Sequence, residues 1–339
     1  MDPVSQGLVG SVLPASASNK KEIRLAILIG FLAGLLADMD VVIRSSTDPL
    51  LFIEYHRQFT HSLIIIPIGG LIAAGFCWLF LRKRLGFWKI YLYAVLGFGT
   101  HCFLDACTNY GTELLWPFSD LKIAWNNVSI IDPIFTITLL VLMVVAVIRK
   151  SKTASRIALV FAISYLLFGL YQKERVEDTV LALAETRGHE IERMEIHPSI
   201  GNLILWRSIY ECDGIYYVQA IRVSPISAPQ IYSGDSIKAY DPDTEIADLD
   251  KDSVLYHDIE RFKHFARGFL VVHPDYPNII GDLRMGMLPN SILPIWGIEF
   301  NPSNQNEHVS MENYDRSLDD GKLKTFLSML QGKDLDDQN

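Results

Sequence analysis

The sequence has few cysteines, and no two of them form a CxxC pair. Four cysteines occur in 339 residues, and three of them, Cys77, Cys102 and Cys107, lie in apolar segments. Free cysteines buried among apolar side chains pack like small hydrophobic residues. The sequence therefore indicates neither a disulfide framework nor a zinc–thiolate site.

The chain also lacks an overall excess of basic charge. Residues 1–171 hold 14 Lys and Arg against 10 Asp and Glu, whereas residues 172–339 hold 16 against 29, so the two parts carry net charges of +4 and −13. The strongly acidic second part disfavours nucleic acid as a partner. With 50% hydrophobic residues and a mean hydropathy of +0.21, we expect a membrane half followed by a water-soluble half, divided near Tyr171.

The N-terminus lacks the pattern of a cleavable signal, because no basic region precedes its short apolar run. This run, residues 7–13, ends at Pro14 and is too short to cross a bilayer. It is expected to form a half-helix inside the bundle or a segment at the membrane interface. No internal repeat is visible.

Five longer apolar segments follow, and each is predicted to cross the membrane. They are residues 25–37, 62–81, 90–107, 130–148 and 157–171. Basic residues follow the second and fourth segments, and the positive-inside rule places these basic loops in the cytoplasm. The C-terminal domain then lies outside the cytoplasm.

The C-terminal half, residues 172–332, is predicted to be a soluble α+β domain with an antiparallel sheet. Short apolar runs between turn residues predict strands at 202–206, 214–222, 269–272 and 296–300. Helices are predicted at 174–190, 248–267 and 319–330, and residues 333–339 are expected to be a disordered tail. The fold class is therefore a multi-spanning α-helical membrane bundle followed by a soluble α+β domain.

Histidine and aspartate residues gather at the non-cytoplasmic ends of these segments. Nothing in the orientation rule used these residues, so their position on one face is independent support for a shared site. Ionisable groups at membrane depth are expensive and are usually functional. They are Asp38, Asp40, His56, His61, His101, Asp105 and Asp132.

Each pair of these residues has an ordinary explanation when it is taken alone. His101 and Asp105 are four apart and share a helix face, which suits metal binding or a hydrogen-bonded core pair. Asp38 and Asp40 could simply end a helix. His56 and His61 are five residues apart and cannot share a helix face, so His56 is expected in the loop and His61 near the start of the helix. Two histidines at the membrane interface would explain the pair equally well.

Taken together, the residues predict a divalent cation that relieves repulsion among crowded carboxylates. Mixed His and Asp ligation suits Zn²⁺, Mn²⁺ or Fe²⁺, and we expect Zn or Mn. The candidates exceed one tetrahedral set, so either a second metal or carboxylates behind the ligands are implied. The predicted ligands are Asp40, His56, His61, His101 and Asp105.

Three further residues are predicted to take part in catalysis. Asp38 and Asp132 belong to the same face, and Arg57 could hold a phosphate through two hydrogen bonds. An interfacial arginine that extends towards the lipid headgroups explains Arg57 equally well.

These motifs resemble the YdjM-like family of bacterial inner-membrane proteins, which are regarded as metal-dependent hydrolases. The resemblance covers about residues 1–150 and implies a multi-pass protein of the bacterial inner membrane. The family usually has a Thr-His pair near position 6, where this chain has Ser5 and Gln6, so the site is expected to lack one imidazole. The motifs that carry the resemblance are 37–40 (Ala-Asp-Met-Asp), 56–62 (His-Arg-Gln-Phe-Thr-His-Ser), 101–105, 110–112 (Tyr-Gly-Thr), 116–119 (Trp-Pro-Phe-Ser) and 132–133 (Asp-Pro).

The sequence thus favours a membrane-embedded hydrolase whose His/Asp site faces outward. Because the site lies at the bilayer boundary, a membrane lipid or a lipid-linked phosphoester is the expected substrate. Two other functions remain open: a metal or proton transporter, and a non-enzymatic scaffold with a vestigial metal site. The protein partner of the C-terminal domain is not predicted.

Overall fold

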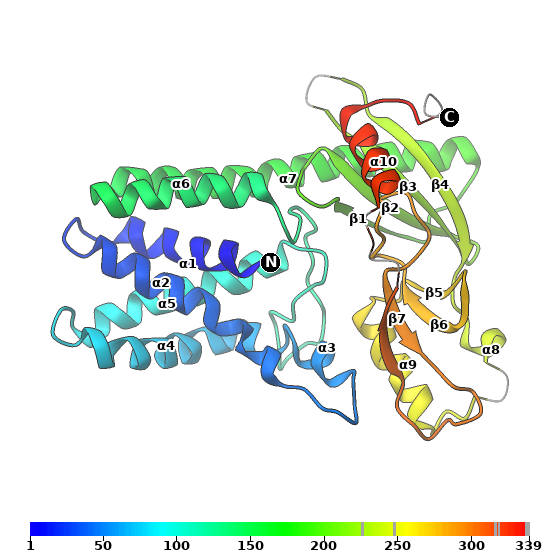
Figure 1. Ribbon diagram of the computed structural model, residues 1–339, viewed down its shortest axis with the longest axis horizontal. Coiled ribbons are helices and arrows are strands. Elements are labelled where there is room, and N and C mark those ends of the chain that lie inside the picture. The colour runs from blue at the N-terminus through cyan, green and yellow to red at the C-terminus, as the bar shows by residue number, and fades with distance from the viewer. Residues whose placement is uncertain (225–226, 247–248, 315–316, 318, 336–339) are drawn as a thin grey trace. The chain divides into compact units, whose positions relative to one another are not determined.

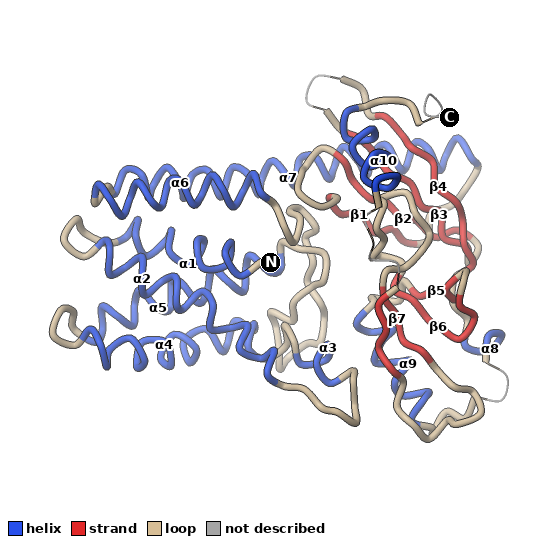
Figure 2. Tube along the Cα trace, in the orientation of Figure 1, coloured by secondary structure: helices blue, strands red, loops and turns tan. Residues whose placement is uncertain are grey.

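The computed structural model describes residues 1–224, 227–246, 249–314, 317 and 319–335 (Figures 1 and 2). The last four residues of the predicted tail lie outside the described residues. The chain forms two compact units. The N-terminal unit comprises Met1–Ile43, Tyr55–Tyr171 and Ile200–Asn202, and the C-terminal unit comprises Arg44–Glu54, Gln172–Ser199 and Leu203–Asn339.

The N-terminal unit is helical. Its helices and 3₁₀ turns are α1 (Pro3–Ala17), α2 (Ile23–Leu36), η1 (Ala37–Val42), η2 (Phe59–His61), η3 (Leu63–Ile65), α4 (Ile66–Leu81), α5 (Phe87–Ala106), α6 (Pro133–Arg149) and the first half of α7 (Lys152–Arg187). The short helix α3 (Leu51–Tyr55) lies at the boundary between the units.

Helix α1 is longer than the sequence predicts. Asp2 caps its N-terminus by accepting hydrogen bonds from the backbone N–H groups of Val4 and Ser5 at 3.1 and 3.0 Å. The predicted end at Pro14 is wrong, because the helix continues to Ala17 with this proline inside its last turn.

Glycines let α1, α2 and α5 approach closely. A Cβ atom on Gly30 would lie 2.3 Å from the carbonyl oxygen of Gly10, and one on Gly97 would lie 2.6 Å from the carbonyl oxygen of Gly30. Such contacts are possible only without side chains, as in close crossings of membrane helices. The crossing packs α1, which carries Gln6, and α5, which carries His101, against α2, which leads directly into the turn η1 with Asp38.

Among the described residues, three helical stretches are long and apolar enough to cross a membrane. They are Ile23–Val42, Leu63–Leu81 and Lys152–Arg187, and the apolar α6 is shorter. The predicted span within α5 is not among them, because its polar residues, including His101 and Asp105, lower its hydropathy.

Helix α7 joins two helices that the sequence predicts separately. The prediction breaks the chain after Tyr171, whereas α7 runs without interruption from Lys152 to Arg187. The change from apolar to charged side chains alters the surroundings of a helix but does not end it, since no proline or cap intervenes. The two compact units meet along the chain inside this helix, between Tyr171 and Gln172.

The C-terminal unit contains two four-stranded antiparallel sheets, whereas the sequence predicts one. Their strand orders are β1-β2-β3-β4 and β5-β6-β7-β8. The strands are β1 (Arg193–Pro198), β2 (Leu205–Cys212), β3 (Ile215–Arg222), β4 (Gln230–Lys238), β5 (Leu270–His273), β6 (Tyr276–Asp282), β7 (Trp296–Glu299) and β8 (Ser310–Asn313).

The runs predicted at 214–222, 269–272 and 296–300 correspond to β3, β5 and β7, whereas the run at 202–206 overlaps β2 only at Leu205 and Trp206. Three of the four strands without a predicted run lie at sheet edges. Edge strands such as β4 and β8 expose many polar side chains and so give no apolar run. The unit also contains most of α3, the second half of α7, α8 (Pro242–Glu245), α9 (Val254–Phe265) and α10 (Asp320–Gln331). A core of buried side chains includes Ile209, Val218 and Val271 from both sheets.

Candidate metal centre

Four parts of the N-terminal unit bring the candidate residues together. Helix α2 passes into η1, which carries Asp38 and Asp40, and α5 ends soon after Asp105. Figure 1 shows the C-terminal ends of α2 and α5 at the same end of the helical unit, beside the N-terminus. His61 lies in η2, and His56 lies between α3 and η2.

Four ligand atoms of these residues converge on one point. Nε2 of His61 lies 2.9 Å from Nε2 of His101. Asp38 Oδ1 lies 3.4 Å from the first of these nitrogens and 3.3 Å from the second. Asp105 Oδ2 lies 3.3 and 3.7 Å from the same two nitrogens. The four ligand atoms all lie within 4.8 Å of one another.

Hydrogen bonds on the far sides of the two imidazoles determine where their protons are. Nδ1 of His101 lies 2.6 Å from the carbonyl oxygen of Gly34, which can only accept, so this nitrogen carries the proton. The Thr60 hydroxyl donates to Asp40 Oδ2 at 2.6 Å, and its oxygen lies 2.9 Å from Nδ1 of His61. That nitrogen is therefore a donor as well, and in the neutral imidazoles both Nε2 atoms present lone pairs to the centre.

The centre is thus lined by two imidazole lone pairs and two carboxylate oxygens, from Asp38 and Asp105. Asp105 Oδ2 is buried and makes no hydrogen bond. Ligand atoms around a tetrahedral zinc ion with bonds of ~2.0–2.1 Å are ~3.3 Å apart. The distances of 2.9–3.7 Å bracket that value, so the four residues fit a divalent cation.

Asp40 lies behind His61, outside the inner group of four. Its Oδ1 lies 2.8 Å from Nδ1 of His56, and its Oδ2 accepts from Thr60 and, at 3.2 Å, from the backbone N–H of Arg57. Asp40 is 3% exposed, and its Oδ2 lies 3.4 Å from Nδ1 of His61, on the side of the ring away from the centre. The geometry therefore places Asp38, and not Asp40, in the inner group of four.

His56 lies in a second group that shares Asp38. The ligand atoms of Asp38, Asp40 and His56 also lie within 4.8 Å of one another. Because both oxygens of Asp40 already accept hydrogen bonds, this group resembles an outer layer that orients the inner ligands. The side chains of His56 and Asp38 are 24% and 25% exposed, whereas those of His61 and Asp105 are fully buried. The centre is therefore reached from the side of Asp38.

Arg57 lies beside the centre in a strained conformation. Its φ angle is +65°, which is unusual for a residue other than glycine and is frequent at functional sites. Its Nε lies 3.0 Å from Asp105 Oδ2, its Nη1 donates to Thr108 Oγ1 at 2.8 Å, and its guanidinium lies 5.3 Å from the Tyr110 ring centre. The Arg57 guanidinium therefore lies next to Asp105 Oδ2, a ligand oxygen that makes no hydrogen bond.

Gln6, where the resemblance implies a missing histidine, lies on Asp105. Its Nε2 donates to Asp105 Oδ1 at 2.6 Å, and the amino group of Met1 contacts the same oxygen. The Gln6 side chain is completely buried, and its Oε1 makes no hydrogen bond. Gln6 thus orients Asp105 so that Oδ2 faces the imidazoles.

Asp132 is not among the residues that the structure brings together. It caps α6: Oδ1 accepts from the backbone N–H of Phe135 at 3.1 Å. Its Oδ2 accepts from the Tyr165 hydroxyl at 2.7 Å. Both carboxylate oxygens are thus engaged in holding α6 and α7.

A third group of potential ligands lies in the C-terminal unit, where the sequence predicts no site. Asp48, Asp258 and His308 have ligand atoms within 4.8 Å of one another. Arg261 fills this group: it donates to both oxygens of Asp48, at 3.1 and 2.9 Å, and to Asp258 Oδ1 at 2.9 Å. No sequence signal reveals it, because the residues are separated by up to 260 positions.

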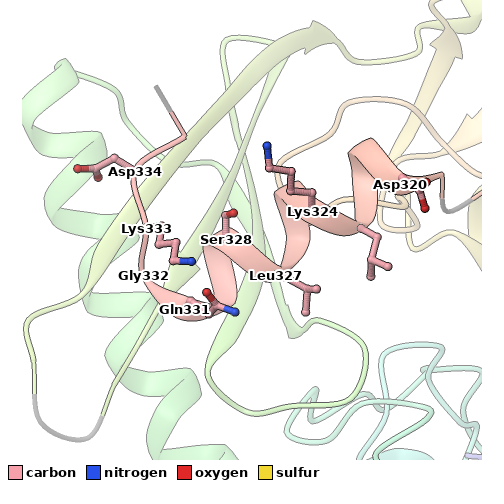
Figure 3. A pocket seen from close by; sticks show the side chains of 9 residues that line it. Asp320, Lys324, Leu327, Ser328, Gln331, Gly332, Lys333 and Asp334 are labelled. Carbon is pink, nitrogen blue, oxygen red and sulfur yellow. The ribbon is translucent and has the colours of Figure 1, made fainter. Parts of the chain in front are cut away.

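The C-terminal unit also has a surface groove along α10 with a volume of about 750 Å³ (Figure 3). Figure 3 shows two of its acidic side chains, Asp320 and Asp334, at opposite ends of the groove. Its basic residues are Lys324 and Lys333, and no group of metal ligands converges on it among the described residues. The groove therefore lacks the chemistry of the centre in the N-terminal unit.

Comparison with known proteins finds relatives of the N-terminal part of the chain. A family model described as YdjM inner membrane protein matches residues 1–176, which include every residue of the inner group. The uncharacterized protein YfhP of Bacillus subtilis (strain 168) is 27% identical over 195 residues, which cover 57% of this chain and 58% of that protein. No solved structure matches the chain. The family match confirms the resemblance that the sequence motifs predict.

Proposed function

The chain belongs to the YdjM inner membrane protein family, and from this membership and the geometry of its centre we propose that it is a membrane-embedded, metal-dependent hydrolase. The observation that carries the proposal is the convergence of four ligand atoms, two from imidazoles and two from carboxylates. Without a cation, these lone pairs would repel one another in a buried site. Asp38, His61, His101 and Asp105 would hold a divalent ion, Zn or Mn by their donor types.

A bound ion of this kind activates water and polarises a phosphoryl or carbonyl oxygen. The residues around it have separate roles in the proposal. Asp40 and Thr60 keep His61 in the tautomer that presents Nε2, and Gln6 fixes the orientation of Asp105. Such outer partners are usually needed for tight metal binding.

Arg57 is the candidate for substrate recognition. Its guanidinium lies at the edge of the centre, 3.0 Å from Asp105 Oδ2. A guanidinium matches the geometry of a phosphate or carboxylate and stays charged at all relevant pH values. We therefore assign Arg57 to the anionic part of the substrate, and Asp38, the partly exposed ligand, to the side from which the substrate arrives.

The proposed substrate is a membrane lipid or a lipid-linked ester or phosphoester. The centre lies at the C-terminal end of Ile23–Val42 and just before Leu63–Leu81, two of the candidate membrane spans. A site at the end of two spans is at the level of the lipid headgroups. A substrate bond near a headgroup would reach Asp38 without leaving the membrane surface.

The proposal includes a topology in the bacterial inner membrane. Helices α2, α4, α5, α6 and the first half of α7 cross it, and α1 lies among them. The basic residues after α4 and α6 face the cytoplasm, which places the centre and the C-terminal unit outside. A reporter fused after Gln331 and active only outside the cytoplasm would support this topology, and one active only inside would contradict it.

Burial of the inner group favours a second candidate, a structural metal that holds the helices together. His61, His101 and Asp105 are completely buried, which is typical of closed structural sites. In this case the ion would stabilise the bundle without a reaction at Asp38.

The test measures bound metal and hydrolysis in the same purified, reconstituted protein. Hydrolysis of a panel of phospholipids and a soluble aryl phosphate is compared for the native chain, His101→Ala and Arg57→Lys. The hydrolase proposal expects His101→Ala to lose both metal and activity, and Arg57→Lys to keep metal but lose most activity. Metal-loaded protein that hydrolyses none of the panel, and unfolds when metal is removed, would favour the structural site. Metal flux into vesicles would instead indicate transport.

A further inference from the structure

The loop after α5 carries large apolar side chains that are exposed. We use the name interfacial loop for residues 112–123. Three of its large apolar side chains are exposed: Phe118 to 83%, Leu121 to 61% and Leu115 to 45%. Exposed apolar side chains concentrated on one short loop are typical of an interaction surface.

The loop is firmly closed at its base. The backbone of Thr112 pairs with that of Ile123 through two hydrogen bonds, of 3.0 and 2.9 Å. Lys122 and Glu113 form a buried ion pair at 3.3 Å, so the charges next to the base neutralise each other. At the tip, the backbone N–H groups of Phe118 and Leu121 donate to groups within the loop. Backbone donors that are already satisfied can enter an apolar medium without a large desolvation cost.

A hydrogen bond fixes the loop at the end of a candidate membrane span. The backbone N–H of Leu63 donates to the carbonyl oxygen of Leu114 at 2.9 Å. Leu63 is the first residue of the span Leu63–Leu81, so the loop lies at the level where the hydrocarbon region ends. Phenylalanine and leucine side chains of interfacial segments bury themselves at the boundary between headgroups and acyl chains, so the partner of the exposed tip is the lipid.

The same loop touches the proposed site. The backbone N–H of Glu113 donates to the carbonyl oxygen of Arg57 at 3.0 Å. Trp116 packs against Phe59, with ring centres 6.1 Å apart, and Phe59 opens the turn that carries His61. The loop therefore connects the lipid level directly with the arginine beside the centre.

We propose that the interfacial loop inserts Phe118 and Leu121 into the outer lipid leaflet, so that lipid molecules reach Arg57 sideways along the loop. The delivery of lipid to the centre for hydrolysis rests on the proposed function. The insertion of the loop does not depend on that function, because it follows from the exposed apolar side chains and from the hydrogen bond between Leu63 and Leu114.

The test measures the depth of the loop in vesicles. The four native cysteines are buried, so a cysteine introduced by Phe118→Cys can be labelled selectively with an environment-sensitive fluorophore. The protein is reconstituted into phosphatidylcholine–phosphatidylglycerol vesicles with or without nitroxide-labelled lipid. Leu323→Cys on α10, an exposed apolar position of the C-terminal unit, is the matched control.

We expect a blue-shifted emission and strong quenching by nitroxide lipid at position 118, and little of either at position 323. Leu121→Cys serves as a second loop position if Phe118→Cys does not fold. An unquenched, water-like emission at both loop positions would overturn the inference. Metal content of the labelled proteins is measured in parallel, so a failed insertion is distinguishable from a failed metal site.

Discussion

Two of the His/Asp groups that could hold a metal ion, one in each unit, differ in how their carboxylates are paired. In the C-terminal unit, each carboxylate oxygen of Asp48 and Asp258 accepts at least one hydrogen bond, mostly from Arg261. In the N-terminal unit, Asp105 Oδ2 makes no hydrogen bond; Arg57 Nε lies 3.0 Å from it, and two imidazole nitrogens converge with it and with Asp38. Distances alone therefore do not identify a metal centre. The convergence of two imidazoles on a carboxylate oxygen that makes no hydrogen bond distinguishes the N-terminal group.

The arginine also explains the electrostatics of the C-terminal group. Burial alone would lower the pKa of Arg261, but hydrogen bonds to Asp48 and Glu54 outweigh it and raise that pKa above its ordinary value. Burial alone would raise the pKa of Asp48, yet Arg261 lowers it. The group is therefore an ion-pair network that already contains its cation.

The largest expected effect is a loss of bound metal when a ligand is removed from the N-terminal group but not when one is removed from the C-terminal group. His61→Ala should reduce bound metal from a stoichiometric amount to an undetectable one, since it removes a buried inner ligand. The matched change His308→Ala should leave metal content unchanged. Elemental analysis of the purified proteins checks both, and loss of metal in the second variant alone would reverse the assignment.

The next effect concerns the pH dependence of the C-terminal unit. Burial lowers the pKa of His197 to about 4, with Arg207 as a second cause. Its two ring nitrogens lie 3.2 and 3.0 Å from the carbonyl oxygens of Pro198 and Arg284. In the unfolded chain, the imidazole of His197 binds a proton near pH 6.5, whereas in the folded chain it does so only near pH 4. The contribution of His197 to the free energy of unfolding is therefore fully present above pH 6.5. That free energy falls by about 3 kcal/mol as the pH drops towards 4.

His197→Gln should make the unfolding free energy of the C-terminal unit less dependent on pH between 6.5 and 4. Chemical denaturation across this range, in the metal-free and metal-loaded protein, provides the measurement. An unchanged pH profile in the variant would show that other groups govern acid unfolding. Because no inner ligand belongs to this unit, metal should not alter the result.

A smaller effect is expected behind the metal centre. Asp40→Asn keeps the shape of the side chain but weakens its hold on Thr60 and His56. Loss of an outer partner typically weakens metal binding by ~10–100-fold without abolishing it. Competition with a chromophoric chelator measures the affinity, and complete loss of metal would instead make Asp40 a direct ligand.

The smallest effect tests the ion-pair network. Arg261→Ala should destabilise the C-terminal unit by only about 1 kcal/mol, since the Arg261 side chain is 25% exposed and partly screened. Lys263→Ala, which removes an exposed pair on the same helix, is the control and should change almost nothing. Thermal unfolding checks both variants, and their metal content should equal that of the native chain.

Part of this account could be read from the sequence. The motif at 56–62 and the spacing of His101 and Asp105 predicted which residues meet, because helix periodicity and the alternation of spans fix the ends of segments. The sequence could not predict that Asp38 faces the imidazoles while Asp40 binds Thr60 behind them. It depends on η1, a 3₁₀ turn that directs one carboxylate to the imidazoles and the other to Thr60.

Other features depend on contacts between distant residues and had no local signal. The role of Gln6 follows from its hydrogen bond to Asp105, 99 positions away. The Arg261 network joins α9 to Asp48, 213 positions away. Edge strands such as β4 and β8 were missed because their exposed, polar side chains give no apolar run.

The number of imidazoles around the bound metal tests the central claim most directly. X-ray absorption spectroscopy of the metal-loaded protein counts them from their multiple-scattering pattern. The account predicts two imidazoles and no sulfur, in agreement with His61 and His101 beside Asp38 and Asp105. A single imidazole, as the group of Asp48, Asp258 and His308 would give, or oxygen ligands alone, would contradict it.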